Sequence, residues 1–153
     1  MEKTLLIFKP SAVQRGLVGD VLSRFERKGL RIAALKMAQL TPEVLRQHYA
    51  HLVQKPFYPL IEESMMASPV VLCCLEGVDA VQVVHEMAGA TNGRKAQPGT
   101  VRGDYCMSNQ ENIIHTSDSP ETAEAELARF FVPSDYFDYV LPVQKYLYAP
   151  DEQ

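Results

Sequence analysis

Apolar residues along the chain fall into short runs separated by amphipathic stretches, a pattern typical of a protein that has both strands and helices. Three compact apolar runs predict strands: TLLIF at residues 4–8, LRIAALKMAQL at residues 30–40 and PVVLCCLEG at residues 69–77. A fourth, short strand is expected at residues 112–116, where isoleucines follow a polar loop. The pattern therefore predicts four strands.

Helices are predicted between and after these strands, because apolar residues recur there at helical spacing. Gly29 is a typical C-cap for the first helix, and Thr41 and Ser119 are typical N-caps for later ones. The expected helices cover residues 17–28, residues 42–52, a further stretch that extends to about Met66, residues 78–88 and residues 120–131.

The order of these elements predicts the fold class. Without the helical insertion after the second strand and without the chain ends, the order is βαββαβ. We therefore predict an α+β, ferredoxin-like fold: a four-stranded antiparallel sheet with helices covering one face, plus the helical insertion and a C-terminal tail. The chain has 153 residues and no internal repeat, so one domain over residues 1–153 is expected.

One loop is unusually long. Residues 89–103, GATNGRKAQPGTVRG, are polar and show no periodicity. A loop of this length is uncommon in a compact domain unless it has a function.

Charge excludes one class of partner. The chain has a formal net charge of −4 and a sequence pI near 5.5. A protein of this charge has no overall positive field, so general nucleic-acid binding is not expected. Basic residues can still gather in a cleft, and the composition is compatible with binding of a small anion.

Cysteine usage and the N-terminal residues indicate a location. The three cysteines, Cys73, Cys74 and Cys106, form no even set and have no zinc-ligand spacing, which favours buried thiols in a reducing compartment. The chain begins without the regions of a signal peptide, and its longest apolar run, residues 70–75, is too short to cross a bilayer. We expect a soluble, cytoplasmic protein without a membrane partner.

His115 is the first candidate for chemistry. It precedes the capping residues Ser117, Asp118 and Ser119. A helix N-terminus attracts anions and disfavours a nearby cation, so a histidine there tends to be neutral, and a neutral imidazole nitrogen is a nucleophile. The alternative is a histidine on a polar surface, and this stretch alone does not decide between the two.

Two glutamates of the last helix flank its apolar face, and either could orient an imidazole through its second nitrogen. On the helical wheel Glu126 lies beside Phe130, and Glu124 lies beside Phe131. Periodicity does not choose between them, and two solvated acids are the simpler alternative.

Basic residues at a strand end and in the long loop could converge on phosphates or be dispersed surface cations. They are Lys9, Arg94, Lys95 and Arg102. His48 and His51 stand three residues apart on a predicted helix, a spacing that suits a metal. Since no third ligand lies nearby in the sequence, we do not expect a metal there.

The residues around His115 resemble the active-site signature of the nucleoside diphosphate kinase family. NIIHTSDS at residues 112–119, followed by AEAEL at residues 123–127, matches the pattern NxxHxSDS…E. Other stretches are similar to further blocks of the family in the same order, and the resemblance extends from about residue 4 to residue 131. These stretches are IFKPSAVQRGLVG, KGLRIAALKM, HY, KPFY, SPVV, GATN and PGTVRGDY.

The resemblance implies a ferredoxin-like fold and a ping-pong transfer of the γ-phosphoryl group from a nucleoside triphosphate such as ATP to a nucleoside diphosphate. It implies that His115 carries the phosphoryl group, that Glu126 supports it and that Ser117 stands beside it. It also implies Mg²⁺ as cofactor, held by the nucleotide phosphates rather than by protein side chains. The remaining implied site residues are Lys9, Arg102, Thr91 and Asn112 for the phosphates and sugar, Tyr49 near the histidine, and Phe57 under the base.

Two positions depart from the family pattern. His85 stands where the family usually has an arginine that contacts the phosphates, and a histidine carries no fixed charge. We hypothesise that Arg94 or Lys95, in the adjoining loop, compensates. Asn109 stands where the family often has a small apolar residue near the base.

The main prediction is therefore a nucleoside diphosphate kinase. The alternative is a non-catalytic nucleotide-binding or scaffolding member of the same fold, which would be expected to lack His115 or its partners. A DNA-binding regulator is disfavoured by the acidic composition. The resemblance also implies a homo-oligomer, and we expect a hexamer rather than a tetramer.

Overall fold

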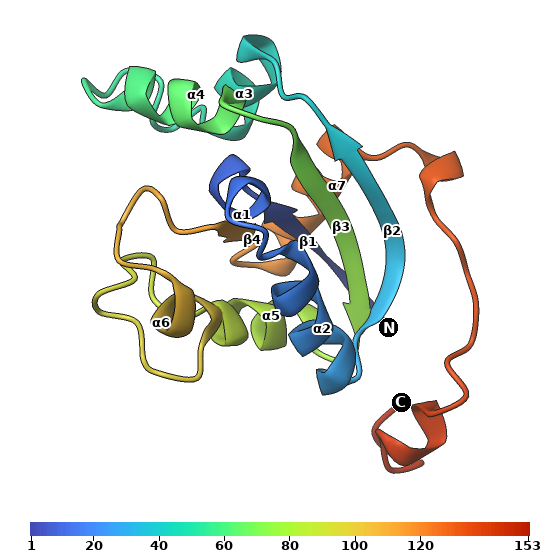
Figure 1. Ribbon diagram of the computed structural model, residues 1–153. Coiled ribbons are helices and arrows are strands. Elements are labelled where there is room, and N and C mark those ends of the chain that lie inside the picture. The colour runs from blue at the N-terminus through green and yellow to red at the C-terminus, as the bar shows by residue number, and fades with distance from the viewer.

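A four-stranded antiparallel sheet forms the centre of the computed structural model, which describes all residues 1–153 (Figure 1). Strand β1 (Glu2–Phe8) pairs with β3 (Val70–Gly77) on one side and with β4 (Ile114–Thr116) on the other. Strand β2 (Arg31–Ala38) pairs with β3 at the edge. The strand order β2-β3-β1-β4 and the helical connections confirm the ferredoxin-like prediction.

Helices cover both faces of this sheet, whereas the βαββαβ pattern predicted one covered face. Helices α2 (Val18–Lys28) and α5 (Ala80–Ala88) pack on one face (Figure 1). The insertion supplies α3 (Pro42–His48) and α4 (Tyr58–Met66), which with α7 (Pro120–Phe130) cover the other face. None of these helices combines the length and the apolar character that a membrane span needs.

The two covered faces explain the apolar runs of the central strands. In β1, Leu6 and Phe8 pack into the core on the α2 and α5 side, and Leu5 and Ile7 pack into the core on the α7 side. Every residue of β3 is buried. Because neither face of this strand meets water, its sequence is a continuous apolar run rather than an alternating one.

The predicted helix caps are present. Gly29 ends α2 in the left-handed region with φ of 109°. Thr41 Oγ1 accepts a hydrogen bond from the backbone N–H of Val44 at 3.3 Å, and Ser119 Oγ accepts one from Thr122 at 3.1 Å. These bonds satisfy donors that a helix N-terminus otherwise leaves free.

Two short helices were not predicted. Helix α1 (Pro10–Gln14) directly follows β1, and α6 (Val101–Tyr105) lies at the end of the long polar loop. Five residues are too few to display an apolar period, so periodicity could not reveal either helix. Both lie beside residues that the resemblance assigns to the nucleotide site.

Helix α6 is held in place by polar contacts rather than by an apolar stripe. Thr100 Oγ1 accepts a hydrogen bond from the backbone N–H of Gly103 at 3.0 Å. Asp104 forms an ion pair with Arg24 of α2, with an N–O distance of 2.6 Å. These contacts fix the position of Arg102 within the same turn.

The C-terminal tail extends along the outside of β2 (Figure 1). The backbone N–H of Phe137 donates to the carbonyl of Ala33 at 2.8 Å, and Tyr139 Oη donates to the carbonyl of Ile32 at 2.8 Å. Only two short 3-10 turns interrupt the tail, at Pro133–Asp135 and Gln144–Tyr146. The tail therefore occupies part of the hydrogen-bonding edge of β2.

A glycine in α6 yields a test of this packing. A Cβ on Gly103 would lie 1.9 Å from the carbonyl oxygen of Gln97 and 2.8 Å from Thr100 Oγ1. We expect Gly103→Ala to lower the free energy of unfolding by about 1–3 kcal/mol, because backbone atoms must move. Urea unfolding followed by circular dichroism measures the change.

Gly19 of α2 is the matched control, because a Cβ there meets no heavy atom within 4 Å. Gly19→Ala is expected to keep the free energy of unfolding or raise it by up to about 1 kcal/mol. Equal destabilisation by the two substitutions would contradict the packing described for α6.

Candidate active site

A cleft of about 790 Å³ opens beside β4. It is bordered by the end of β1, by α3 and α5, by the long loop with α6, and by one flank of α7. Most of the site residues expected from the sequence line this cleft. They are Lys9, Tyr49, His85, Thr91, Arg102, Asn112, His115 and Glu126.

Other expected residues do not line the cleft. Ser117 is fully buried beneath it, and Phe57 lies at the start of α4 with 46% of its surface exposed. Arg94 donates to the carbonyl of Met107 at 2.6 Å, and Lys95 is exposed. Since neither Arg94 nor Lys95 reaches the cleft, the structure gives no support to the hypothesis that they compensate for His85.

His115 is paired with Glu126 of α7. The distance from His115 Nε2 to Glu126 Oε2 is 2.5 Å, and the Glu126 side chain is buried. Glu126 lies one turn before the end of α7, beside the apolar residues that fix the helix on the sheet. The structure thus brings one of the two candidate glutamates to the histidine.

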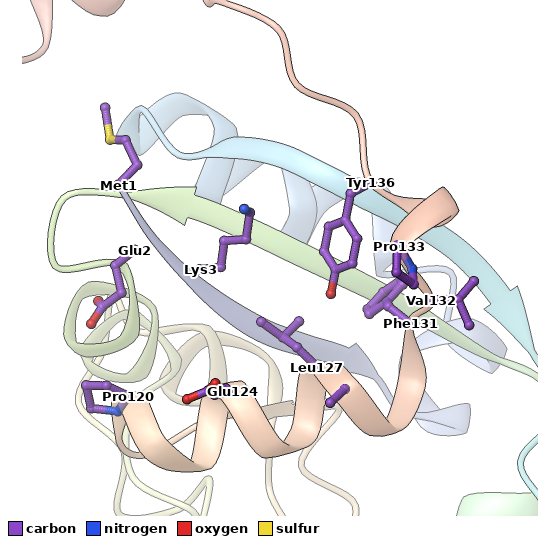
Figure 2. A pocket seen from close by; sticks show the side chains of 11 residues that line it. Met1, Glu2, Lys3, Pro120, Glu124, Leu127, Phe131, Val132, Pro133 and Tyr136 are labelled. Carbon is purple, nitrogen blue, oxygen red and sulfur yellow. The ribbon is translucent and has the colours of Figure 1, made fainter.

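The other candidate, Glu124, lies on the opposite flank of α7. Figure 2 shows it with Leu127, Phe131 and Tyr136 around a second hollow, of about 750 Å³. The only basic side chain lining this hollow is Lys3, which is paired with a glutamate of β3. The cationic surroundings that phosphate needs are therefore found at the cleft and not here.

Glu126 remains an anion in spite of its burial. Burial alone would raise its pKa, but the hydrogen bond and charge of His115, the hydroxyl of Ser117 and the nearby His48 lower the pKa below its usual value. An ionised carboxylate only accepts hydrogen bonds, so the tautomer of His115 that this contact favours has its proton on Nε2. The other nitrogen, Nδ1, has no hydrogen-bond partner within the protein and retains its lone pair.

The backbone before His115 is strained. Ile113 has φ of 59°, and the N–H of Ile114 donates to the carbonyl of Asn112 at 2.8 Å, closing a three-residue turn around it. A β-branched residue rarely adopts this conformation. The turn is held because Ile113 is fully buried and its carbonyl accepts from the N–H of Lys9 at 2.8 Å.

Lys9 and Asn112 meet at the floor of the cleft. Lys9 Nζ donates to Asn112 Oδ1 at 2.7 Å, and Asn112 Nδ2 donates to the carbonyl of Thr91 at 3.0 Å. Burial, with the nearby positive charge of Arg102, lowers the pKa of Lys9 to about 8. A buried cation of this kind lacks a carboxylate partner and is suited to an anionic ligand.

Arg102 is a structural residue as well as a cleft residue. Its three guanidinium nitrogens donate to the backbone carbonyls of Asn112 at 3.3 Å, Gly89 at 2.9 Å and Ile114 at 2.7 Å. Burial lowers its pKa from the usual value. Its positive charge is therefore held at the cleft by carbonyl oxygens and not by an acid.

His85 occupies the position of the expected arginine, at the wall of the cleft formed by α5. Its Nδ1 lies 3.2 Å from the hydroxyl of Thr116, the residue after His115. The imidazole is thus tied to β4 beside the candidate nucleophile.

Sequence reasoning missed Arg129 and considered His48 only as a metal ligand. Arg129 lines the cleft three residues after Glu126, a spacing that puts both on one flank of α7 and could have revealed it. Its guanidinium lies 3.0 Å from Nδ1 of the buried His48. The ring of His48 stands edge-on to that of His115, with centroids 4.5 Å apart.

We assign no metal to these side chains. His48, His115 and Glu126 offer ligand atoms within 4.8 Å of one another, and the exposed His51 does not join them. However, the guanidinium of Arg129 faces the same His48 nitrogen, and it would repel a cation there.

Comparison with known proteins agrees with this geometry. The family described as nucleoside diphosphate kinase matches residues 2–136. A nucleoside diphosphate kinase of Parabacteroides distasonis is 60% identical over 152 residues, 99% of each chain. One from Rhodopirellula baltica is 52% identical, covering 99% of this chain and 100% of the relative.

Solved structures are similar throughout the fold. A halophilic nucleoside diphosphate kinase from Halobacterium salinarum, in complex with CDP, has a TM-score of 0.94 at 36% identity, covering 97% of this chain and 99% of that one. A nucleoside diphosphate kinase family protein from Babesia bovis has a TM-score of 0.92 at 36% identity, covering 97% and 100%. The chain belongs to the nucleoside diphosphate kinase family and is a phosphotransferase.

Proposed function

We propose that this protein transfers the γ-phosphoryl group of a nucleoside triphosphate such as ATP to a nucleoside diphosphate through a phosphohistidine at His115. The observation that supports this most directly is the pairing of His115 Nε2 with the buried, ionised Glu126. This pairing leaves Nδ1 as an unprotonated nitrogen in a cleft that also holds Lys9 and Arg102. A nitrogen in this state is a competent nucleophile.

In the first half-reaction, the lone pair of His115 Nδ1 attacks the γ-phosphorus. The bond from that phosphorus to the bridging oxygen breaks, and the nucleoside diphosphate leaves with the bonding electrons. The phosphorylated imidazole keeps its proton on Nε2 and becomes cationic, and the Glu126 carboxylate stabilises that charge.

In the second half-reaction, a terminal phosphate oxygen of the acceptor diphosphate attacks the same phosphorus. The N–P bond breaks and its electrons return to Nδ1, which restores the free histidine. Because donor and acceptor occupy the cleft in turn, one set of phosphate ligands serves both.

The phosphate and sugar groups would be held by Lys9, Thr91, Arg102 and Asn112, with His85 and Tyr49 at the cleft wall. The hydrogen bond between Lys9 and Asn112 is available for exchange with phosphate oxygens. The solved relative in complex with CDP supports nucleotide binding by this fold. Phe57, whose ring is partly exposed, would stack on the base and so accept any base by its face.

Magnesium fits this cleft as a cofactor that arrives with the nucleotide. The carboxylates that line the cleft, other than Glu126, are Asp118 and Glu121, and both are exposed. Mg²⁺ retains water and prefers phosphate oxygens, so two separate acids do not make a closed protein cage. When bound, the ion supplies charge neutralisation to the phosphates.

We also propose a cytoplasmic homo-oligomer, with a hexamer favoured over a tetramer. The three buried, free thiols support a reducing compartment. Apolar side chains on β2 and the tail, including Met37 at 62% and Phe137 at 69% exposure, support contact between copies. The choice of a hexamer rests on the family resemblance.

Labelling tests the proposed phosphohistidine. Incubation with γ-labelled ATP should leave a label on the protein that is labile in acid and stable in base, and His115→Ala should abolish it. An acid-labile label of the same size in the His115→Ala variant would contradict the assignment of His115.

The two glutamates of α7 form a matched pair of variants. Glu126→Gln should slow phosphorylation of His115 by about 10- to 100-fold, because the partner that orients and stabilises the imidazole is lost. Glu124→Gln, on the opposite flank of α7, should remain within about twofold of the parent rate. Rapid-quench experiments measure the rate of phosphoenzyme formation in each variant. Equal rates for the two variants would refute the proposed role of Glu126.

Lys9 predicts an alkaline limit to activity. Because its pKa in the free protein is lowered to about 8, it is charged below that pH and loses its charge above it. We expect kcat/KM to fall as the pH rises through about 8. In Lys9→Arg the cation persists, so the fall should disappear from this range. If kcat/KM of Lys9→Arg still falls over the same pH range, the titrating group is not Lys9.

A further inference from the structure

His48 is fully enclosed beside the proposed nucleophile, yet the proposed reaction does not use it. Its Nδ1 has two polar neighbours: the guanidinium of Arg129 at 3.0 Å and Glu126 Oε2 at 3.3 Å. Its Nε2 is buried and has no hydrogen-bond partner. A buried polar atom without a partner is uncommon in a native protein and calls for an explanation.

The donor and acceptor chemistry of the neighbours identifies the tautomer of His48. Burial, with the nearby His115 ring, lowers the pKa of His48 to about 3, so its ring is neutral and has one proton. An arginine can only donate, so Nδ1 must accept where Arg129 faces it, and the proton is then on Nε2. The unpartnered Nε2 is the consequence of this arrangement.

Glu126 explains why this tautomer matters. Its Oε2 faces two imidazole rings, at 2.5 Å from His115 Nε2 and 3.3 Å from His48 Nδ1. With a proton on Nδ1, His48 would donate to this oxygen and compete with His115 for it. With the proton on Nε2, His115 is the only imidazole donor to Oε2.

We propose that Arg129 is a positioning residue that holds His48 in its Nε2–H tautomer and so reserves the Glu126 carboxylate for His115. The edge-on contact between the two imidazole rings, with an interplanar angle of 80°, then limits rotation of His115. The expected effect on rate rests on the proposed function, whereas the tautomer of His48 does not.

A direct role of Arg129 as a phosphate ligand is the rival explanation, because its side chain also lines the cleft. The two explanations differ in their dependence on His48. A phosphate ligand acts whether or not His48 has a nitrogen, while a tautomer-setting residue has no function once that nitrogen is removed.

The first experiment uses the unmodified protein. Nitrogen-15 NMR of the histidine rings at neutral pH reports which nitrogen of His48 has the proton. We expect a neutral ring with a protonated Nε2, and in Arg129→Leu a shift of the proton to Nδ1. A protonated Nδ1 in the unmodified protein would overturn the proposal without any variant.

The second experiment is a double-mutant cycle with phosphoenzyme formation as its readout. Arg129→Leu should slow phosphorylation of His115 by about 10-fold with KM changed less than about twofold, and Arg129→Lys, which also only donates, should restore the rate. In the His48→Phe background, Arg129→Leu should have no further effect. Equal slowing in both backgrounds, or a KM effect in place of a rate effect, would overturn the proposal in favour of direct phosphate binding.

Failure of the two proposals is distinguishable. If the unmodified protein takes no label on His115, the proposed function fails. The NMR experiment still decides the tautomer of His48 in that case, because it needs no turnover.

Discussion

The cleft beside β4 depends on one buried cation, Arg102. The guanidinium of Arg102 joins the carbonyls of Gly89, Asn112 and Ile114, which belong to the end of α5, the turn before β4 and β4 itself. A buried charge is costly unless it is fully hydrogen-bonded, and here backbone carbonyls, not an acid, supply the partners. These three segments are thereby joined by a positive charge that has no carboxylate partner. Lys9 donates a hydrogen bond to the side chain of Asn112, whose backbone carbonyl accepts one from Arg102. Arg102 therefore also helps to position the floor of the cleft.

The two flanks of helix α7 border two hollows with different chemistry. Its inner residues Leu127 and Phe130 pack on the sheet, one flank borders the apolar hollow of Figure 2, and the other flank borders the cleft. Packing of the helix therefore positions the carboxylate of Glu126 within hydrogen-bonding distance of His115. The carboxylate is positioned by the same apolar contacts that stabilise the fold, so precision at the site requires no separate scaffold.

The strands, the long helices and their caps could be predicted because each leaves a periodic or punctuating signal, as the run of β3 and the caps Gly29 and Thr41 show. Helices α1 and α6 could not, since five residues contain too little period. The wheel placed both glutamates of α7 at the edges of its apolar face, but the flank that meets His115 depends on tertiary packing. Loop cations are still less predictable: Arg94 binds a carbonyl at 2.6 Å and does not face the cleft.

The strained turn at Ile113 links the pairing of His115 and Glu126 to the packing of the core. Its unusual conformation is stable only while the isoleucine is enclosed by the core and its carbonyl is bonded to the end of β1. Disruption of the core around Ile113 would remove what holds this turn, and with it the position of His115 beside Glu126. The short contact between His115 and Glu126 is thus a local reporter of native packing around Ile113.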